Sequence, residues 1–213
     1  MNTISPWCSP AYVISATDPA YPMKRHWFAI AALLPVLVAP AQAADCDSFS
    51  GVGDWATSVC THFGRIASEG SWDMYLTGYT WHDPHTWTDE KRAELNANAW
   101  GGGFGKHLTD EQGNQDILYG MVFADSHDHP ELMLGYGKLW LWPSASQLSV
   151  GAGYTVGLTS RNDIIGGLPF PFILPLVALR YRRVSVMGTF IPSLNSSLNS
   201  GNVGFLFGRY EFK

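Results

Sequence analysis

Three residues of this chain have the types that acyl transfer requires, and they lie at the ends of strand-like segments. His82 ends the first such segment, and the pair Asp125 and Ser126 ends the third. A serine, a carboxylate and a histidine that can accept a proton near neutral pH are the ingredients of acyl transfer. The chain contains seven histidines, and a solvated histidine without a catalytic role is the alternative interpretation. The three residues form a candidate site only if the fold brings them together.

Further histidines and carboxylates lie close to these three residues in the sequence. His127-Asp128-His129 follows Ser126 directly, and Asp83 and His85 follow His82. The H-x-H spacing with scattered carboxylates matches no tight metal-binding motif. We therefore interpret these residues as part of solvated loops and predict no metal site.

The composition of the chain favours a transmembrane barrel. Of its 213 residues, 14% are aromatic and 15% are charged, whereas about a quarter of a soluble domain is charged. The mean hydropathy of -0.02 is lower than that of a helical membrane protein, which would be more hydrophobic. In a transmembrane barrel, every second residue can be polar or small while aromatic residues gather at the two interfaces. The net charge of -5 without a basic stripe argues against nucleic-acid binding.

The pattern after residue 70 predicts an all-β fold, an eight-stranded antiparallel transmembrane β-barrel preceded by a short N-terminal amphipathic α-helix. The predicted strands are 72–82, 100–107, 115–125, 132–142, 147–159, 173–181, 184–191 and 202–212. In an up-and-down barrel, the ends of the first and third strands lie on the same side. His82 and Ser126 are therefore expected to meet at one rim.

The alternation within the strands predicts a barrel with an apolar bore. On the fifth strand one parity is large and apolar, whereas the other carries Ser149, Gly151, Gly153, Thr155, Gly157 and Thr159. Because lipid requires an apolar exterior, the small residues are expected to face inward and leave space for one slender ligand. The eighth strand adds Val203, Phe205 and Phe207 to this inner face, with Arg209 and Glu211 beyond them as a polar floor. The alternative is that single glycines mark bulges or close strand packing.

The N-terminal part of the chain is predicted to be a targeting segment. Residues 23–43 have the form of a secretory signal peptide: the positive run Lys24-Arg25-His26, about a dozen apolar residues, and the cleavage signal Ala41-Gln42-Ala43. A membrane anchor is the alternative, but a spanning helix needs about twenty apolar residues. We interpret residues 1–22 as an extension that results from a wrongly assigned start codon.

Residues 44–70 are expected to form a segment that precedes the barrel domain, 71–213. Its apolar residues recur at helical spacing and predict a short amphipathic helix in the membrane interface, with one face made of Trp55, Val59, Phe63 and Ile66. Cys46 and Cys60 form an even pair in a secreted chain, so a disulfide is permitted. Two free thiols are the alternative.

A series of short motifs follows a specific order along the predicted strands. They are Tyr79-Thr80-Trp81-His82, Trp100-Gly101-Gly102-Gly103-Phe104-Gly105, Leu118-Tyr119-Gly120-Met121-Val122-Phe123-Ala124-Asp125-Ser126, Gly135-Tyr136-Gly137, Leu174-Pro175-Leu176, Phe190-Ile191-Pro192 and Gly201-Asn202-Val203. The ordered set covers residues 72–212 and resembles the lipid A palmitoyltransferase (PagP) family. The resemblance implies an outer-membrane acyltransferase that moves a palmitoyl chain from the sn-1 position of a glycerophospholipid to a hydroxyacyl chain of lipid A.

The resemblance also implies roles for individual residues. His82 is the expected general base, and Asp125 and Ser126 are expected to orient the histidine or the reacting carbonyl. Gly137, with Gly135 beside it, falls at the floor of the family's acyl-chain pocket. Headgroup contacts on the extracellular side are expected from Arg161, Asp110 and Tyr75. The implied protein is monomeric, needs no metal or cofactor, and has an active site that faces the cell exterior.

Lateral gaps between strands are a further implication, and here the sequence departs from the family. Pro175 and Pro192 remain at the gap between the sixth and seventh strands, where proline cannot donate to the strand ladder. At the gap between the first two strands, Thr77 and Ala99 replace the family's prolines. The backbone at this first gap can therefore be paired or unpaired.

Two other functions fit parts of the sequence. A non-catalytic barrel, an adhesion or stress-response protein, would share the architecture but fill its lumen with charged or bulky side chains. A soluble lipocalin-like carrier would need polar outer faces, which the fifth strand contradicts. The packing of the lumen therefore discriminates between the enzyme and its strongest rival.

Overall fold

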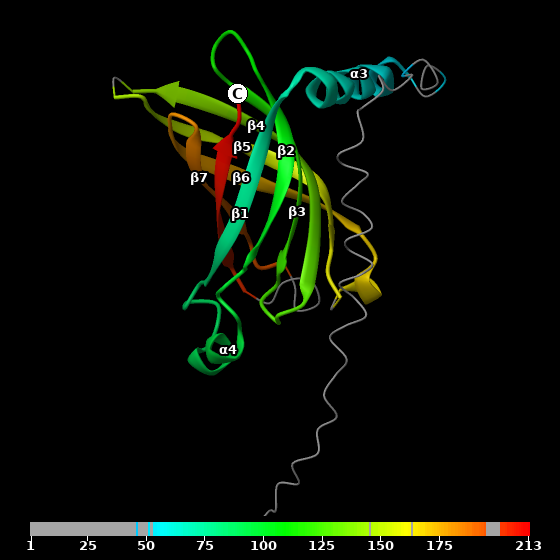
Figure 1. The fold of residues 1–213 in the computed structure, drawn as a ribbon. Helices are drawn as coiled ribbons and strands as arrows, with labels where there is room; N and C mark the ends of the chain where they lie inside the picture. Colours follow the sequence, from blue (N-terminus) through cyan, green and yellow to red (C-terminus); the bar gives the residue numbers. More distant parts are fainter. Residues whose placement is uncertain (1–45, 47–50, 52, 145, 163, 195–200) are drawn as a thin grey trace, which may run out of the picture. The chain divides into compact units, whose positions relative to one another are not determined.

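A closed antiparallel barrel forms the body of the computed structural model, which describes residues 46, 51, 53–144, 146–162, 164–194 and 201–213. Consecutive strands pair and β1 closes onto β8 (Figure 1). The strands are β1 Ser71–His82, β2 Gly101–Thr109, β3 Gln115–Ala124, β4 Pro130–Pro143, β5 Leu148–Ser160, β6 Phe170–Tyr181, β7 Val184–Ile191 and β8 Val203–Glu211. The predicted fold class is confirmed. The predicted extension and signal peptide lie outside the described residues.

The predicted strand limits agree with the structure to within a few residues, and β7 agrees fully. The β6 strand begins at Phe170 rather than Ile173, because the residues from Phe170 onward already pair with β5. The first residues of this strand do not pair with β7. A short helix that was not predicted, α4 Asp89–Glu94, lies in the connection between β1 and β2. The side chain of Thr88 caps this helix by accepting a hydrogen bond from the backbone N–H of Lys91.

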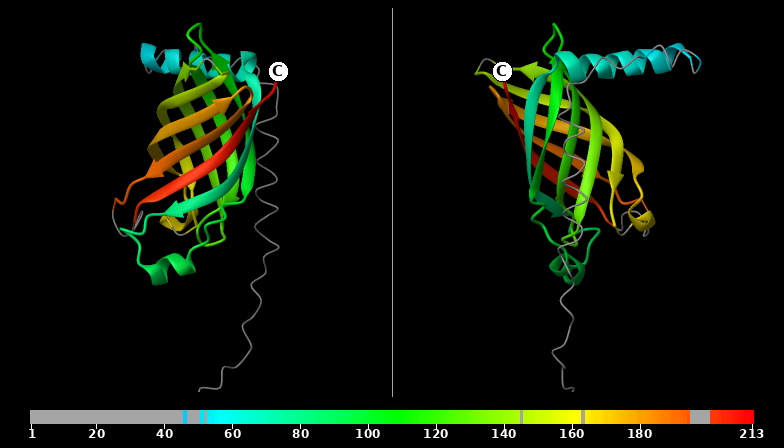
Figure 2. Two further views of the ribbon diagram at one scale, coloured as in Figure 1. Left: turned by 90° about the vertical axis from the view of Figure 1, so that its left-hand side faces the viewer. Right: turned by 45° about the vertical axis from the view of Figure 1, so that its right-hand side comes forward.

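A longer helix, α3 Asp54–Glu69, precedes the barrel and contains the predicted helical segment. It crosses the strand direction at one mouth of the barrel, here called the α3 mouth (Figure 2). Lys106 Nζ donates to the carbonyl of Ala67 at 2.6 Å, and Ile66 is buried against the barrel. Cys46 and Cys60 form a disulfide, so the permitted bridge is present. No helix among the described residues is long and apolar enough to cross a membrane.

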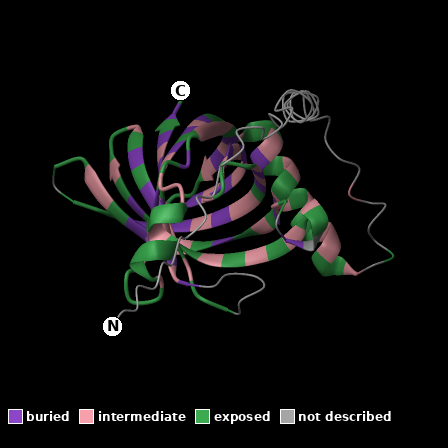
Figure 3. Ribbon diagram, turned by 90° about the horizontal axis from the view of Figure 1, so that it is seen from below, coloured by how far each residue is buried: buried purple, intermediate pink, exposed green. Residues whose placement is uncertain are grey.

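The two faces of the wall alternate as the sequence predicts. On β5, Val150, Tyr154 and Leu158 are exposed, whereas Thr155 and Thr159 are buried. The same alternation runs along the other strands (Figure 3). Water would strongly disfavour this outer band, because each Å² of exposed apolar surface costs about 25 cal/mol. The exterior therefore fits lipid rather than water, and the polar exterior of a soluble carrier is absent from the described strands.

The lumen at the α3 mouth contains the predicted polar floor. Its members are Asp73, His107, Gln115, Arg180, Arg209 and Glu211. The guanidinium of Arg209 is fully buried and lies 2.9 Å from Asp73 and 2.7 Å from the side-chain oxygen of Gln115. Arg180 donates two hydrogen bonds to Glu211, at 2.9 and 2.7 Å. Paired charges of this kind avoid the large cost of an isolated buried ion.

Arg209→Met is expected to destabilise the barrel by about 3–5 kcal/mol, because it removes the guanidinium from the buried carboxylate of Asp73 and leaves the His107 contact. Urea unfolding in lipid vesicles, followed by tryptophan fluorescence, measures the change. Arg65→Met is the control, because the Arg65 side chain is exposed and pairs on the surface of α3 with Glu69, which is equally exposed, so stability should change by less than about 0.5 kcal/mol. Equal unfolding midpoints for both variants would contradict a structural role for the floor.

Candidate acyl-transfer site

His82 and Ser126 meet at the mouth of the barrel opposite α3, here called the His82 mouth. His82 is the last residue of β1, and Ser126 lies in the turn between β3 and β4. The Nε2 atom of His82 lies 3.0 Å from the Oγ atom of Ser126. The side chain of His82 is 7% exposed. The C-terminal ends of β1 and β3 thus lie at the same mouth of the barrel, as the up-and-down topology predicts.

An irregularity in β1 turns His82 into the lumen. Asp73, Tyr75 and Thr77 face inward, and the register with β8 then shifts between Thr77 and Tyr79. Because side chains alternate with a period of two, one extra residue moves all later side chains to the other face. Without this bulge His82 would point toward lipid. Gly78 inside the strand pattern was the available signal, because an isolated strand glycine often marks a bulge.

Asp125 organises the turn that carries Ser126. Its Oδ1 atom accepts hydrogen bonds from the backbone N–H groups of His127 and His129, both at 2.8 Å. Its own N–H donates to the carbonyl of His129 at 2.8 Å. Ser126, rather than Asp125, therefore touches the imidazole, and the carboxylate fixes the turn from which the serine projects. Its Oδ2 atom is buried without a hydrogen-bond partner among the described residues.

A pocket opens at the His82 mouth around these residues. Its deeper wall is apolar and includes Phe123, Met133 and Phe205. The rings of Phe123 and Phe205 stack with centroids 4.8 Å apart, although their strands, β3 and β8, are not neighbours. Two aromatic side chains thus join across the lumen beneath the His82–Ser126 contact.

The residues expected at the headgroup are divided between the two ends of the barrel. Arg161 lines the pocket, with its Nε atom 4.0 Å from Glu131. Asp110 lies in the turn between β2 and β3, at the α3 mouth. Tyr75 is 1% exposed, and its hydroxyl lies 3.4 Å from Asp73 in the polar floor. Asp110 and Tyr75 therefore lie toward the end of the barrel that is remote from His82, and only Arg161 of the three lies beside it.

Side chains fill part of the bore that small residues were expected to leave open. Gly135 and Gly137 face inward on β4. A Cβ atom at Gly135 would lie 2.5 Å from the ring of Tyr119, whose hydroxyl lies 2.7 Å from Thr155 Oγ1. A Cβ atom at Gly137 would meet its nearest neighbour, Leu176, at 3.4 Å. A Cβ atom at Gly137 would thus fit in ordinary van der Waals contact, whereas Tyr119 occupies the space beside Gly135.

Two strand ladders are interrupted at the His82 mouth, the β6–β7 ladder, where a gap was expected, and the β1–β2 ladder, for which the sequence left pairing open. Between β6 and β7, pairing stops at Leu176 and Thr189, so Pro175 and the residues before it pair only with β5. Pro192 directly follows the end of β7. At the end of this ladder, Thr189 Oγ1 donates across the gap to the carbonyl of Pro175 at 2.7 Å.

The gap between β1 and β2 exists without its prolines. The ladder ends at Thr77 and Gly101, before the last residues of β1. Beyond it, Thr77 Oγ1 donates to the carbonyl of Ala99 at 2.5 Å, and the N–H of Thr80 donates to the carbonyl of Ala97. A threonine hydroxyl therefore bridges each of the two gaps.

Comparison with known proteins identifies the family. Residues 62–209 match the family model described as antimicrobial peptide resistance and lipid A acylation protein PagP. The chain is 43% identical over 190 residues to the lipid A acyltransferase PagP of Bordetella bronchiseptica, covering 89% of this chain and 100% of that protein. It is 43% identical over 151 residues to lipid A acyltransferase PagP of Legionella pneumophila, covering 71% of this chain and 79% of that protein. This barrel, with its imidazole and serine at one mouth, belongs to the PagP family.

Proposed function

We propose that the protein transfers a palmitoyl chain from the sn-1 position of a glycerophospholipid to a hydroxyacyl chain of lipid A. One observation carries the proposal: His82 Nε2 lies 3.0 Å from Ser126 Oγ, at the rim of a pocket with an apolar deeper wall. The matched relatives carry the name lipid A acyltransferase.

His82 acts as the proton carrier in the proposed reaction. An attacking hydroxyl oxygen bonds to the carbonyl carbon of the donor ester, and its proton passes to the imidazole. The bond from that carbon to the glycerol oxygen then breaks, and this oxygen takes the proton from His82. The products are the acylated acceptor and a lysophospholipid, and no cofactor is needed. The attacking hydroxyl is either that of lipid A or that of Ser126 in a two-step transfer.

The acyl chain lies in the lumen in this proposal. Phe123 and Phe205 lie directly below the reacting groups, so a chain that enters must displace their stacked rings. Farther down, it must pass Tyr119 to reach Gly137. Arg161, on the pocket wall beside Glu131, supplies a cationic contact for a phosphate of the donor or of lipid A.

The barrel is proposed to lie in the outer membrane as a monomer, with the His82 mouth facing the cell exterior. The apolar outer band supports a membrane location. Because His82, Ser126 and Arg161 come from one chain, the site needs no second copy. Lipids are proposed to enter laterally where the β6–β7 ladder is interrupted, next to Pro175 and Pro192.

Gly137→Met is expected to shift the transferred chain from palmitoyl to a shorter length. The new side chain would extend from the inner face of β4 toward Leu176 and fill the end of the lumen. Mass spectrometry of lipid A, after reaction with phospholipids of graded chain length, measures the shift. Leu134→Met on the lipid-facing side of β4 is the control. An unchanged chain profile in Gly137→Met would place the end of the pocket elsewhere.

An isotope experiment tests the proposed reaction. Purified protein in detergent micelles is incubated with lipid A and a phospholipid whose sn-1 palmitoyl chain alone is deuterated. The proposal requires deuterated palmitoyl on lipid A and an equal amount of lysophospholipid. Label that stays on the phospholipid, or transfer only when the sn-2 chain is labelled, would contradict it.

A further inference from the structure

The two reacting groups are not held together by the barrel wall alone. The β1–β2 ladder ends at Thr77 and Gly101, below the level of His82. Ser126 lies beyond the end of β3, in a turn. Close to the His82 mouth, β1 keeps its partner β8, with His82 opposite Val203. Other contacts must therefore set the distance between the imidazole and the serine.

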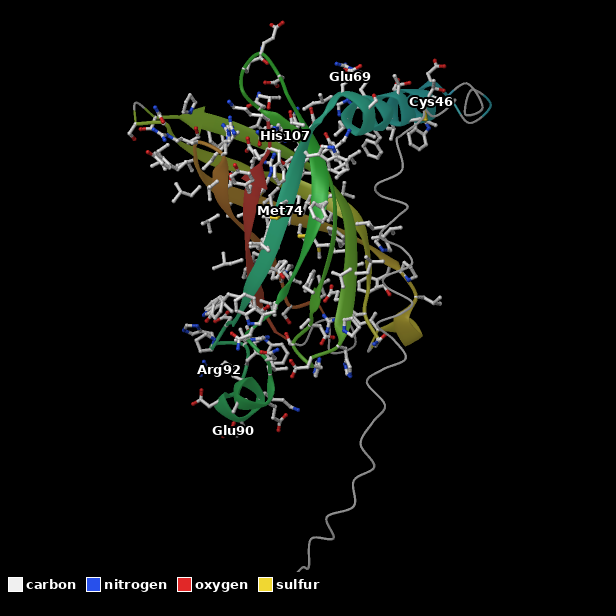
Figure 4. All side chains as sticks on the ribbon, in the orientation of Figure 1. Cys46, Glu69, Met74, Glu90, Arg92 and His107 are labelled. Carbon is white, nitrogen blue, oxygen red and sulfur yellow. A yellow bond between two sulfur atoms is a disulfide. The ribbon has the colours of Figure 1, made fainter. Side chains whose placement is uncertain are left out.

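The connection between β1 and β2, residues 83–100, spans this gap and is here called the strap. It includes α4, whose residues Glu90 and Arg92 lie at the barrel end remote from His107 (Figure 4). One end of the strap is anchored to the beginning of β8, and the other end is anchored to the turn that carries Ser126.

The first anchor is Asn202, which uses all its polar groups. Its carbonyl accepts hydrogen bonds from the N–H of Asp83 at 3.1 Å and from the indole of Trp87 at 3.2 Å. Its N–H donates to Thr86 Oγ1 at 2.9 Å. Its side chain donates to Asp83 Oδ2 at 3.0 Å and accepts from the N–H of Ser193 at 2.9 Å. Asn202 thus joins the strap to the ends of β7 and β8.

This anchor places an aromatic wall against the imidazole. The Trp87 ring meets the His82 ring edge-on, with centroids 5.8 Å apart and an interplanar angle of 88°. The indole packs so closely on Gly201 that a Cβ atom there would collide with its Nε1 atom. The glycine of the Gly201-Asn202-Val203 motif therefore makes room for Trp87, and the asparagine holds it.

The second anchor is Asn96, at the other end of the strap. Its N–H donates to the carbonyl of Ser126 at 2.9 Å. Its side-chain amide donates to Asp128 Oδ1, in the same turn as Ser126. The side-chain oxygen accepts from the N–H of Asn98 at 2.7 Å, which fixes the asparagine side chain. The strap therefore holds the serine turn directly.

We propose that the strap sets the distance between His82 and Ser126, with Asn202 and Asn96 as positioning residues at its two ends. The inference rests on the proposed roles of His82 and Ser126. Near-attack geometry is sensitive, since a misplacement of about 1 Å can cost roughly a hundredfold in rate. Loss of either anchor therefore lowers the rate of transfer without removing a group that touches substrate.

Asn202→Asp tests the first anchor by charge. Hydrogen bonds from the His85 N–H and from Asn202 hold the pKa of the Asp83 carboxyl below its ordinary value, so it is ionised at neutral pH. The variant replaces the amide of Asn202, which donates to Asp83, by a second negatively charged carboxylate that repels Asp83. The maximal rate is expected to fall about tenfold to a hundredfold, with little change in the phospholipid concentration that gives half-maximal rate. Adding Asp83→Asn exchanges the amide and the carboxylate between the two positions. The double variant can again form the hydrogen bond and is expected to restore the rate.

Asn96→Asp tests the second anchor in the same way, because it faces the carboxylate of Asp128. The partner change Asp128→Asn suits the backbone, since Asp128 has φ of 61° and asparagine is favoured in this region. The double variant is expected to recover the rate. Lys91→Ala on α4, which removes only an exposed ion pair with Glu94, is the control and should leave the rate unchanged.

Rates are measured per folded barrel, with the folded fraction taken from the gel shift of unheated samples. Two slow single variants and two restored double variants support the strap. Single variants with the normal rate, or double variants that stay as slow as the singles while folded, overturn it. If His82→Ala retains activity, the proposed function itself fails, whereas a normal Asn202→Asp beside an inactive His82→Ala removes only the strap.

Discussion

His82→Ala is expected to reduce transfer of palmitate to lipid A by roughly 10²–10⁴-fold, the usual contribution of a general base. The imidazole is the group that takes the proton from the attacking hydroxyl, and its Nε2 atom lies 3.0 Å from Ser126 Oγ at the pocket rim. Alanine removes the base and leaves the backbone pairing of His82 with Val203 unchanged. The rate is measured with labelled phospholipid and lipid A in micelles.

The matched control for this loss is His62→Ala. His62 lies on α3 at the other mouth, 3.6 Å from Asp116, and is not part of the pocket. Its replacement is expected to leave the rate within about twofold, because His62 lies at the opposite mouth and does not line the pocket. A folded His82→Ala barrel that still transfers at the rate of His62→Ala would remove His82 from the mechanism.

Ser126→Ala is the second substitution with a large expected effect, a loss of at least roughly 10²-fold. The hydroxyl either attacks the donor ester itself or holds the imidazole for attack by lipid A. Without Oγ, the two-step route loses its nucleophile, and the direct route loses the group that holds the imidazole. Asp125 still organises the turn through the N–H groups of His127 and His129. Retained transfer in a folded Ser126→Ala barrel would contradict both routes.

Intact-protein mass spectrometry separates the two routes. In the two-step route, incubation with phospholipid alone adds one palmitoyl group to the wild-type protein and none to Ser126→Ala. In the direct route, neither protein gains mass while both remain folded. Asp125→Asn complements this test, because an amide oxygen can still accept hydrogen bonds from the turn, so this variant should lose less activity than Ser126→Ala.

The strand pattern predicted most of the fold because lipid imposes a strict rule on the outer face. Val150, Tyr154 and Leu158 must face lipid, which fixes the parity of β5 and hence the small residues of its inner face. Turn formers then delimit each strand. The helix α3 followed equally from its apolar spacing.

The site was less predictable because its geometry depends on irregular backbone. The bulge at Gly78, which turns His82 inward, adds one residue that no alternation pattern reveals. The strap is held by side chains such as Asn202 and Trp87, whose partners are far apart in the sequence. Local propensity carries no information on such pairs.

The sequence pattern also could not predict which side chains fill the lumen. Counting inward glycines predicts space but not which neighbour fills it, and Tyr119 occupies the space beside Gly135. Tyr75 and Asp110 were assigned by resemblance, and their strand positions place them toward the α3 mouth. The direction of each strand in an up-and-down barrel is enough to separate Asp110, which follows the end of β2, from His82 at the end of β1.

The central claim is that this barrel acylates lipid A through the imidazole at its mouth. The most direct measurement is the mass of lipid A from cells that lack their own lipid A palmitoyltransferase and produce either the wild-type chain or His82→Ala. We predict one additional palmitoyl group on lipid A with the wild-type chain and none with His82→Ala. Lipid A of unchanged mass with a folded wild-type barrel, or equal acylation by both chains, would contradict the account.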